Sequence, residues 1–105
     1  MTARAYEFQT EILKAIAQET RLSIIELLRD GERCVCEIFP AINQEQSNVS
    51  RHLNVMQKAG ILTRRKEGLR IFYAVKHPEV LAIIELAAAL MKNEAGSRND
   101  LLRTG

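Results

Sequence analysis

Residues 46–75, QSNVSRHLNVMQKAGILTRRKEGLRIFYAV, decide the fold because the spacing of their apolar residues changes halfway along the segment. In the first half, apolar residues recur three and four positions apart: Val49, Leu53 and Met56. This spacing predicts one helix over about residues 45–59, which Gly60 terminates. The second half predicts two short strands, 61–66 and 70–75, joined by a turn. The segment therefore predicts a helix followed directly by a β-hairpin.

Further helices are predicted on both sides of this segment. Helical spacing of apolar residues marks residues 6–17, and Thr20 is a suitable N-cap for a second helix over residues 21–30. A third, shorter helix is predicted over about residues 34–42. After the hairpin, Pro78 suits the first turn of a last helix.

The predicted order is helix, helix, tight turn, helix and basic hairpin, which is the order of a winged helix-turn-helix. Asn43 suits the tight turn because asparagine tolerates a left-handed backbone. The predicted fold class is therefore mainly α with a small β-hairpin. We expect residues 1–92 to form one DNA-binding and dimerisation domain, and residues 93–105 to form a polar, flexible tail.

The last predicted helix contains VLAIIELAAALM at residues 80–91, which is apolar on nearly every face. A chain of 105 residues cannot bury all sides of such a helix within one subunit. We therefore expect a homodimer that forms through the first and last helices.

Positive charge is concentrated in one part of the chain. Residues 44–76 contain seven basic and two acidic residues, a net charge of +5, whereas residues 1–43 carry −2 and residues 77–105 carry −1. This distribution is expected if the central segment alone faces a polyanion.

Composition narrows the class of protein. Hydrophobic residues make up 47% and charged residues 27% of the chain, which argues against a disordered or fibrous protein, and no apolar run is long enough to cross a membrane. The N-terminal segment lacks the apolar block of a signal peptide, so we expect a cytoplasmic protein with no membrane partner and with reduced thiols. No nucleophile and base at a recognisable spacing and no phosphate-binding loop are present, so we expect no enzymatic activity and no obligatory cofactor.

The helix over residues 45–59 carries polar residues on its outward face. These residue types are suited to contacts with double-stranded DNA. Glutamine and asparagine pair with adenine, arginine pairs with guanine, and serine contacts phosphates or bases. The predicted DNA contacts from this helix are Gln46, Ser47, Asn48, Ser50, Arg51 and Asn54, with His52 as a minor candidate. Four cations of the hairpin would grip phosphates: Arg64, Arg65, Lys66 and Arg70. The alternative is a protein-interaction module in which the hairpin is only solvated.

Two segments carry a family resemblance: LKAIAQETRLSIIELLRDGERCVCEI at residues 13–38, and residues 46–75 as quoted above. The chain resembles the ArsR/SmtB family of small winged-helix repressors over residues 12 to about 92. The resemblance implies a homodimer that binds an imperfect inverted repeat in double-stranded DNA and leaves this operator when an inducer binds.

Both cysteines of the chain, Cys34 and Cys36, lie in the CVCE sequence. Arsenic-sensing members of the family carry CVCxxC, whose three thiolates bind As(III) or Sb(III), but Phe39 stands here at the third position. On an ideal helix the two thiols would point about 200° apart, so that a shared ligand would require a distorted helix start. Three interpretations stay open: sensing of As(III) or another soft metal ion, a thiol-redox switch, and a pair with no sensing role.

Overall fold

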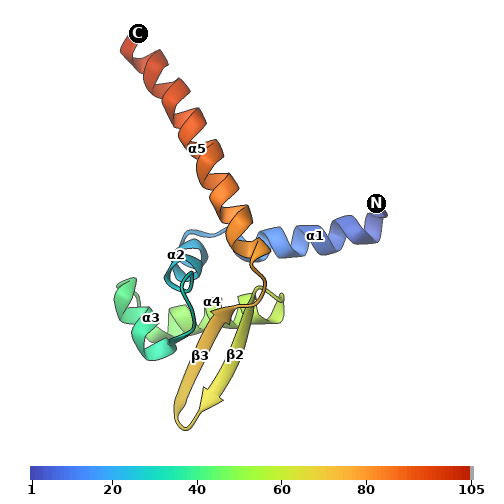
Figure 1. The fold of residues 1–105 in the computed structure, drawn as a ribbon, viewed down its shortest axis with the longest axis vertical. Helices are drawn as coiled ribbons and strands as arrows, with labels where there is room; N and C mark the ends of the chain where they lie inside the picture. The colour runs from blue at the N-terminus through green and yellow to red at the C-terminus, as the bar shows by residue number, and fades with distance from the viewer. Residues whose placement is uncertain (105) are drawn as a thin grey trace.

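The computed structural model describes the backbone of residues 1–104 and the side chains of residues 1–97. It contains five helices and three strands in these residues: α1 Ala3–Ile16, α2 Glu19–Leu27, β1 Arg33–Cys34, α3 Val35–Ala41, α4 Gln46–Lys58, β2 Leu62–Glu67, β3 Arg70–Val75 and α5 Glu79–Thr104. The strands form an antiparallel sheet in the order β1-β3-β2. The β2–β3 hairpin, called the wing below, extends from the helical part of the molecule (Figure 1). This arrangement confirms the winged helix-turn-helix that the sequence predicted.

The core lies between α2, α3, α4 and the base of the wing. α4 buries the apolar residues that predicted it, and Leu53 is 0% exposed. The largest side chains that are fully buried come from all these elements: Ile24, Ile25, Leu28, Ile38, Val49, Leu53, Met56, Ile61 and Leu62. Each such aliphatic side chain stabilises the fold by roughly 1.5–3 kcal/mol relative to full exposure. This burial orients α4, so that its apolar face packs in the core and its polar face points outward.

α2 begins earlier than the sequence predicted. Its N-cap is Gln18, whose side-chain oxygen accepts a hydrogen bond of 3.0 Å from the backbone N–H of Arg21. Thr20, the predicted N-cap, lies inside the helix and is only 7% exposed. The prediction was wrong because the longer glutamine side chain supplies the cap, which leaves the Thr20 hydroxyl free to face the interior.

The segment around the cysteines also differs from prediction. Arg33 and Cys34 form the short strand β1, which pairs with β3, and α3 begins only at Val35. The turn between α3 and α4 agrees with the prediction, because Asn43 has a φ of 54° in the left-handed region. A strand of two residues shows no hydrophobic period, and the sequence pattern therefore missed it.

α1 and α5 project away from the core in different directions (Figure 1). Both helices leave large apolar side chains exposed: Tyr6, Phe8 and Leu13 on α1, and Leu86, Leu90 and Met91 on α5. No helix in the described residues is long and apolar enough to cross a membrane.

α5 runs through residue 93, where the sequence predicted the tail to begin, and its backbone stays helical to Thr104. Good helix formers such as Glu94 and Ala95 continue the helix there. The flexibility expected of residues 93–105 stays a prediction, and Gly105 lies outside the described residues.

Candidate nucleic-acid interface

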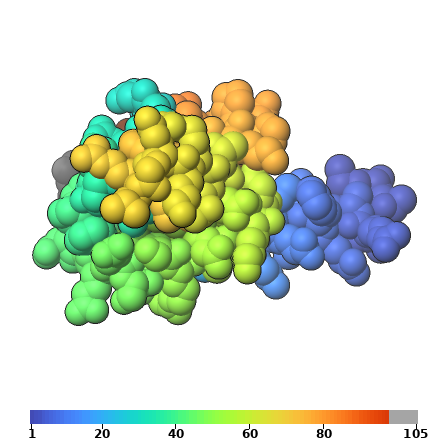
Figure 2. Space-filling view, turned by 90° about the horizontal axis from the view of Figure 1, so that it is seen from below, coloured from blue at the N-terminus to red at the C-terminus, as the bar shows by residue number. Residues whose placement is uncertain are grey.

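A groove with a volume of about 1010 Å³ runs between α3, α4 and the wing, and is called the α4–wing groove below. Figure 2 shows these elements together on one face of the molecule, with α1 set apart from them. The groove is lined by seven of the predicted DNA contacts: Gln46, Ser47, Ser50, Arg51, Asn54, Arg64 and Arg70. No acidic residue is among its described lining residues. The groove therefore combines hydrogen-bonding side chains with uncompensated positive charge, which suits a nucleic acid.

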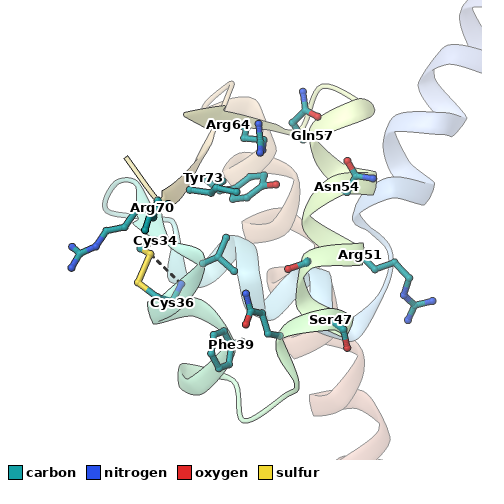
Figure 3. Close-up of a pocket in the computed structure, with 15 residues that line it drawn as sticks. Cys34, Cys36, Phe39, Ser47, Arg51, Asn54, Gln57, Arg64, Arg70 and Tyr73 are labelled. Atoms are coloured by element: carbon teal, nitrogen blue, oxygen red, sulfur yellow. Dashed lines mark hydrogen bonds between the residues drawn. A yellow bond between two sulfur atoms is a disulfide. The ribbon is translucent and has the colours of Figure 1, made fainter. Parts of the chain in front are cut away.

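The remaining predicted contacts of α4 do not line this groove. Asn48 is half-buried, and its side chain accepts a hydrogen bond from Arg51 at 2.7 Å while it donates one to Gln44. His52 is 7% exposed and belongs to the buried side of α4. Arg51 is exposed, and its guanidinium points away from the other residues of the groove (Figure 3), where Asn48 accepts its hydrogen bond.

His52 forms a contact between α4 and α2. The Nε–H of Arg21 donates to its Nδ1 at 3.1 Å, and the same guanidinium donates to the backbone oxygen of Ala15 at 3.3 Å. Burial of the imidazole, followed by the positive charges of Arg21 and Arg51, lowers the pKa of His52 below 6.5. The buried imidazole of His52 therefore packs α4 against α2, and the DNA contact predicted for it stays a prediction.

The four predicted cations of the wing have different surroundings. Arg64 and Arg70 line the α4–wing groove, and Lys66 is exposed outside it. Arg65 instead pairs with Glu32 at 2.5 Å and with Glu67 at 2.7 Å. Its guanidinium lies 4.7 Å from the centre of the Phe72 ring. The hydrogen bond from Arg65 lowers the pKa of Glu32. Arg65 therefore connects the wing to the segment that precedes β1, and its charge is largely compensated.

The cysteine pair lies at one end of the α4–wing groove (Figure 3). Cys34 ends β1 and caps α3, and its Sγ accepts a hydrogen bond of 3.1 Å from the backbone N–H of Cys36. The two sulfurs are joined in a disulfide, across a Cα–Cα distance of 5.1 Å. Cys34 is 3% exposed, whereas Cys36 is exposed. The thiols do not point apart as two helical residues would, because Cys34 has an extended backbone and only Cys36 is helical.

The described residues contain no group of three histidine, cysteine or acidic side chains that could hold a metal ion. Phe39, at the third position of the CVCxxC motif, lines the groove beside the two cysteines. A metalloid at this position would therefore have two protein thiolates and would take its third ligand from elsewhere.

Comparison with known proteins agrees with this geometry. Residues 18–64 match the arsR family of bacterial regulatory proteins. An uncharacterized HTH-type transcriptional regulator of Methanocaldococcus jannaschii is 43% identical over 86 residues, which are 81% of this chain and 97% of that relative. The chain belongs to the arsR family. It is accordingly a DNA-binding transcriptional regulator and not an enzyme.

Two further proteins that are similar to this arsR-family chain have names that state a function or an assembly. The arsenical resistance operon repressor of Escherichia coli is 42% identical over 64 residues, which are 60% of this chain and 55% of that repressor. A homodimeric winged helix-turn-helix DNA-binding domain from Mycobacterium bovis, solved in solution, has a TM-score of 0.79 and 27% identity, and the match covers 89% of this chain and 86% of that domain.

The structure adds side chains to the site of this arsR-family regulator that the sequence analysis had missed. Gln57 lines the α4–wing groove. It follows Ser50 and Asn54 at the spacing of one helix face, and this spacing would have identified it. Gln44 lies in the turn before α4 and bonds to α2, and no periodic pattern marks such a residue.

Proposed function

We propose that this arsR-family chain is a homodimeric transcriptional repressor that reads an imperfect inverted repeat in DNA. The observation that carries the proposal is the α4–wing groove, which polar residues of α4 line together with Arg64 and Arg70 and which has no acidic residue in its described lining. In this proposal α4 contacts base edges in the major groove, and the wing contacts phosphates.

The exposed apolar side chains of α1 and α5 support the homodimer. Both helices project from the core and carry large apolar residues that this subunit does not cover, such as Phe8 and Leu90. The Mycobacterium bovis domain of similar fold is homodimeric. A two-fold dimer would present two copies of α4 to two half-sites, as an inverted repeat requires.

Cys34 and Cys36 are the proposed inducer site, with As(III), Sb(III) or another soft ion as the first candidate inducer. The two sulfurs lie close enough to bond to each other, so one soft ion could contact both thiolates after reduction. The similarity to the arsenical resistance operon repressor supports this candidate. Because Phe39 occupies the third motif position, water or a small thiol would complete the coordination.

A thiol-redox switch is the second candidate, and the disulfide between Cys34 and Cys36 favours it. In this reaction the two thiols lose two protons and two electrons to an oxidant such as a peroxide, and a dithiol reductant reverses the change. The exposed Cys36 would react with the oxidant first, and the buried Cys34 would then close the disulfide.

Binding of a soft ion or formation of the disulfide would affect the proposed DNA-binding face because of where Cys34 lies. Cys34 pairs with Phe72 of β3 in the sheet that carries the wing, and it also caps α3, which packs on α4. Two residues before it, Glu32 holds Arg65 of the wing. A change at the sulfurs would therefore act on the wing and on α4 together.

The test begins with selection of a binding sequence from a randomised duplex library by the purified, reduced protein. The enriched sequence, called the selected duplex, is compared with a scrambled duplex of the same composition by fluorescence anisotropy. Preference for the selected duplex is expected, with a dimer as the bound species. A monomer that enriches no sequence and binds neither duplex at low salt would contradict the proposal and favour the protein-interaction module.

The inducer is tested by titrating the bound complex with As(III) and, separately, with hydrogen peroxide, in wild type, Cys34→Ser and Cys36→Ser. Release of wild type by As(III), but of neither variant, would support the soft-ion sensor. Release only by peroxide and reversal by a dithiol would support the redox switch. A wild-type complex that responds to neither would overturn the assignment of the pair as an inducer site.

A further inference from the structure

A network of side-chain hydrogen bonds connects the buried side of α2 with Arg51 of α4, whose guanidinium points outward from α4 (Figure 3). The amide of Gln44 donates to the hydroxyl of Thr20 at 3.0 Å. Asn48 donates to the carbonyl oxygen of Gln44 at 2.5 Å, and Arg51 donates to the carbonyl oxygen of Asn48 at 2.7 Å. Thr20 and Gln44 are 24 residues apart in sequence, so this series of hydrogen bonds joins two separate parts of the fold.

The amide of Asn48 is engaged on both sides in this series of hydrogen bonds. Its N–H group faces Gln44 and its oxygen faces Arg51, and these are the two groups that a bidentate contact with adenine would need. Asn54 provides the contrast, since it lies three residues after Arg51 as Asn48 lies three before it, and it is exposed and lines the groove. The two asparagines therefore have different surroundings although both are polar residues of α4.

Burial stabilises the inner end of this series of hydrogen bonds, at Thr20 and Gln44. Thr20 is 7% exposed and Gln44 is half-buried, so water competes weakly for their hydrogen bonds. Among the described side chains, no buried nitrogen or oxygen atom lacks a hydrogen-bond partner. Removing Gln44 would leave the Thr20 hydroxyl and the Asn48 amide without the partners they have here.

We propose that Gln44 and Asn48 are positioning residues for DNA recognition: Gln44 orients Asn48, and Asn48 holds the guanidinium of Arg51 in place to read a base. This inference rests on the proposed function of α4 as the DNA-reading helix. A long side chain that is already ordered loses less rotamer freedom on binding, which is a gain of roughly two- to tenfold in affinity. Because only a base contact depends on this orientation, the gain applies to specific DNA and not to phosphate binding.

A double-mutant cycle tests the role of Asn48. The affinities of wild type, Asn48→Ala, Arg51→Ala and the double variant are measured for the selected duplex and the scrambled duplex by anisotropy at one salt concentration. Each single variant is expected to lose about fivefold or more in the ratio of the two affinities. The double variant is expected to lose little beyond Arg51→Ala, and library selection with either single variant should relax preference at the same base pair.

The matched control is the equivalent cycle with Asn54→Ala, whose effect should multiply with that of Arg51→Ala because no hydrogen bond joins the two side chains among the described contacts. An Asn48 cycle that is also multiplicative, or an Asn48→Ala variant that relaxes a different base pair from Arg51→Ala, would overturn the proposal by showing that Asn48 reads a base itself.

The role of Gln44 is tested with Gln44→Leu and Gln44→Glu. Leucine removes both hydrogen bonds and should lower the preference for the selected duplex about as much as Asn48→Ala does. Glutamate loses the N–H that donates to Thr20, but its carboxylate can accept from Asn48 and from the Thr20 hydroxyl, which already lies 3.4 Å from the carbonyl oxygen of Gln44. It should therefore restore most of that preference, and its added charge affects both duplexes alike. Equal preference in Gln44→Leu and wild type would refute the role of Gln44. If wild type itself does not distinguish the duplexes, the proposed function has failed instead.

Discussion

His52 makes the stability of the protein depend on pH, and the direction follows from its surroundings. Burial and the charges of Arg21 and Arg51 lower the pKa of His52 in the folded chain, whereas the unfolded chain titrates near 6.5. Below pH 6.5 the unfolded state therefore binds a proton that the folded state does not yet bind. The stabilising contribution is complete above about pH 6.5 and is lost as pH falls towards the folded pKa.

Because only one proton is involved, the free energy of unfolding falls by at most about 1.4 kcal/mol per pH unit between pH 6.5 and the folded pKa of His52. Protonation would also place an N–H on the Nδ1 atom that now accepts from Arg21 at 3.1 Å, so that two donors would face each other. The carboxylates with lowered pKa values, such as Glu32, titrate below 4.5 and contribute nothing to the change between pH 7.5 and 5.5.

The measurement is urea unfolding followed by circular dichroism at pH 7.5, 6.5 and 5.5, at one protein concentration because a dimer's stability depends on it. Wild type should lose stability towards pH 5.5. In His52→Gln the side-chain oxygen still accepts from Arg21 but does not titrate, so this loss should largely disappear. The control is His77→Gln, because His77 is the other histidine of the chain and is exposed. An unchanged pH dependence in His52→Gln, or its disappearance in His77→Gln, would refute the reasoning.

Three other predictions concern the core and the DNA face. Leu53→Ala should lower the free energy of unfolding by about 2–5 kcal/mol because Leu53 is fully buried, whereas Leu69→Ala at the exposed tip of the wing should not change it measurably in the same urea titration. Arg51→Ala should weaken binding to the selected duplex by about 1–3 kcal/mol in anisotropy titrations, and an unchanged affinity would mean that α4 is not the reading helix. Lys66→Gln should reduce the slope of log affinity against log salt by about 1, and Arg65→Gln should reduce it less because two carboxylates already pair with Arg65; equal slopes would contradict this difference.

The fold could be predicted from the sequence where a hydrophobic period extends over a whole element. α4 and the wing satisfy this condition, and their observed bounds agree with the predicted ones within one or two residues. β1 does not satisfy it, because two residues cannot show a period and its partner strand β3 lies almost forty residues away. The cap of α2 was also missed, because Gln18 and Thr20 both have side chains able to cap a helix and only the packing decides between them.

The candidate site could be predicted as sets of residues on one helix, on the hairpin and around the two cysteines, but not as contacts between those residues. The sequence shows that α4 is polar on one side, but the sequence alone does not distinguish the polar residues Asn48, His52 and Asn54 from one another. Their surroundings differ because Gln44 contacts Asn48 from the preceding turn and Arg21 contacts His52 from α2. Such contacts between distant segments depend on how the helices pack. The spacing of residues within α4 does not reveal that packing.

The position of Cys34 shows how two thiols separated by one residue could act on the whole of the proposed DNA-binding face. If both cysteines belonged to α3, a bond between them would disturb only the first turn of a short helix. Because Cys34 instead ends β1, its backbone belongs to the same ladder as Phe72 of the wing, while its sulfur caps α3. A ligand or oxidant at the sulfurs must therefore act on a residue that the sheet and α3 share. This arrangement predicts that Cys34→Ser, which keeps a capping side chain, should bind DNA like the reduced wild type, and that Cys34→Ala should weaken DNA binding even without an inducer. Equal operator affinity in these two variants, measured by anisotropy on the selected duplex, would show that the cap at Cys34 does not reach the DNA face.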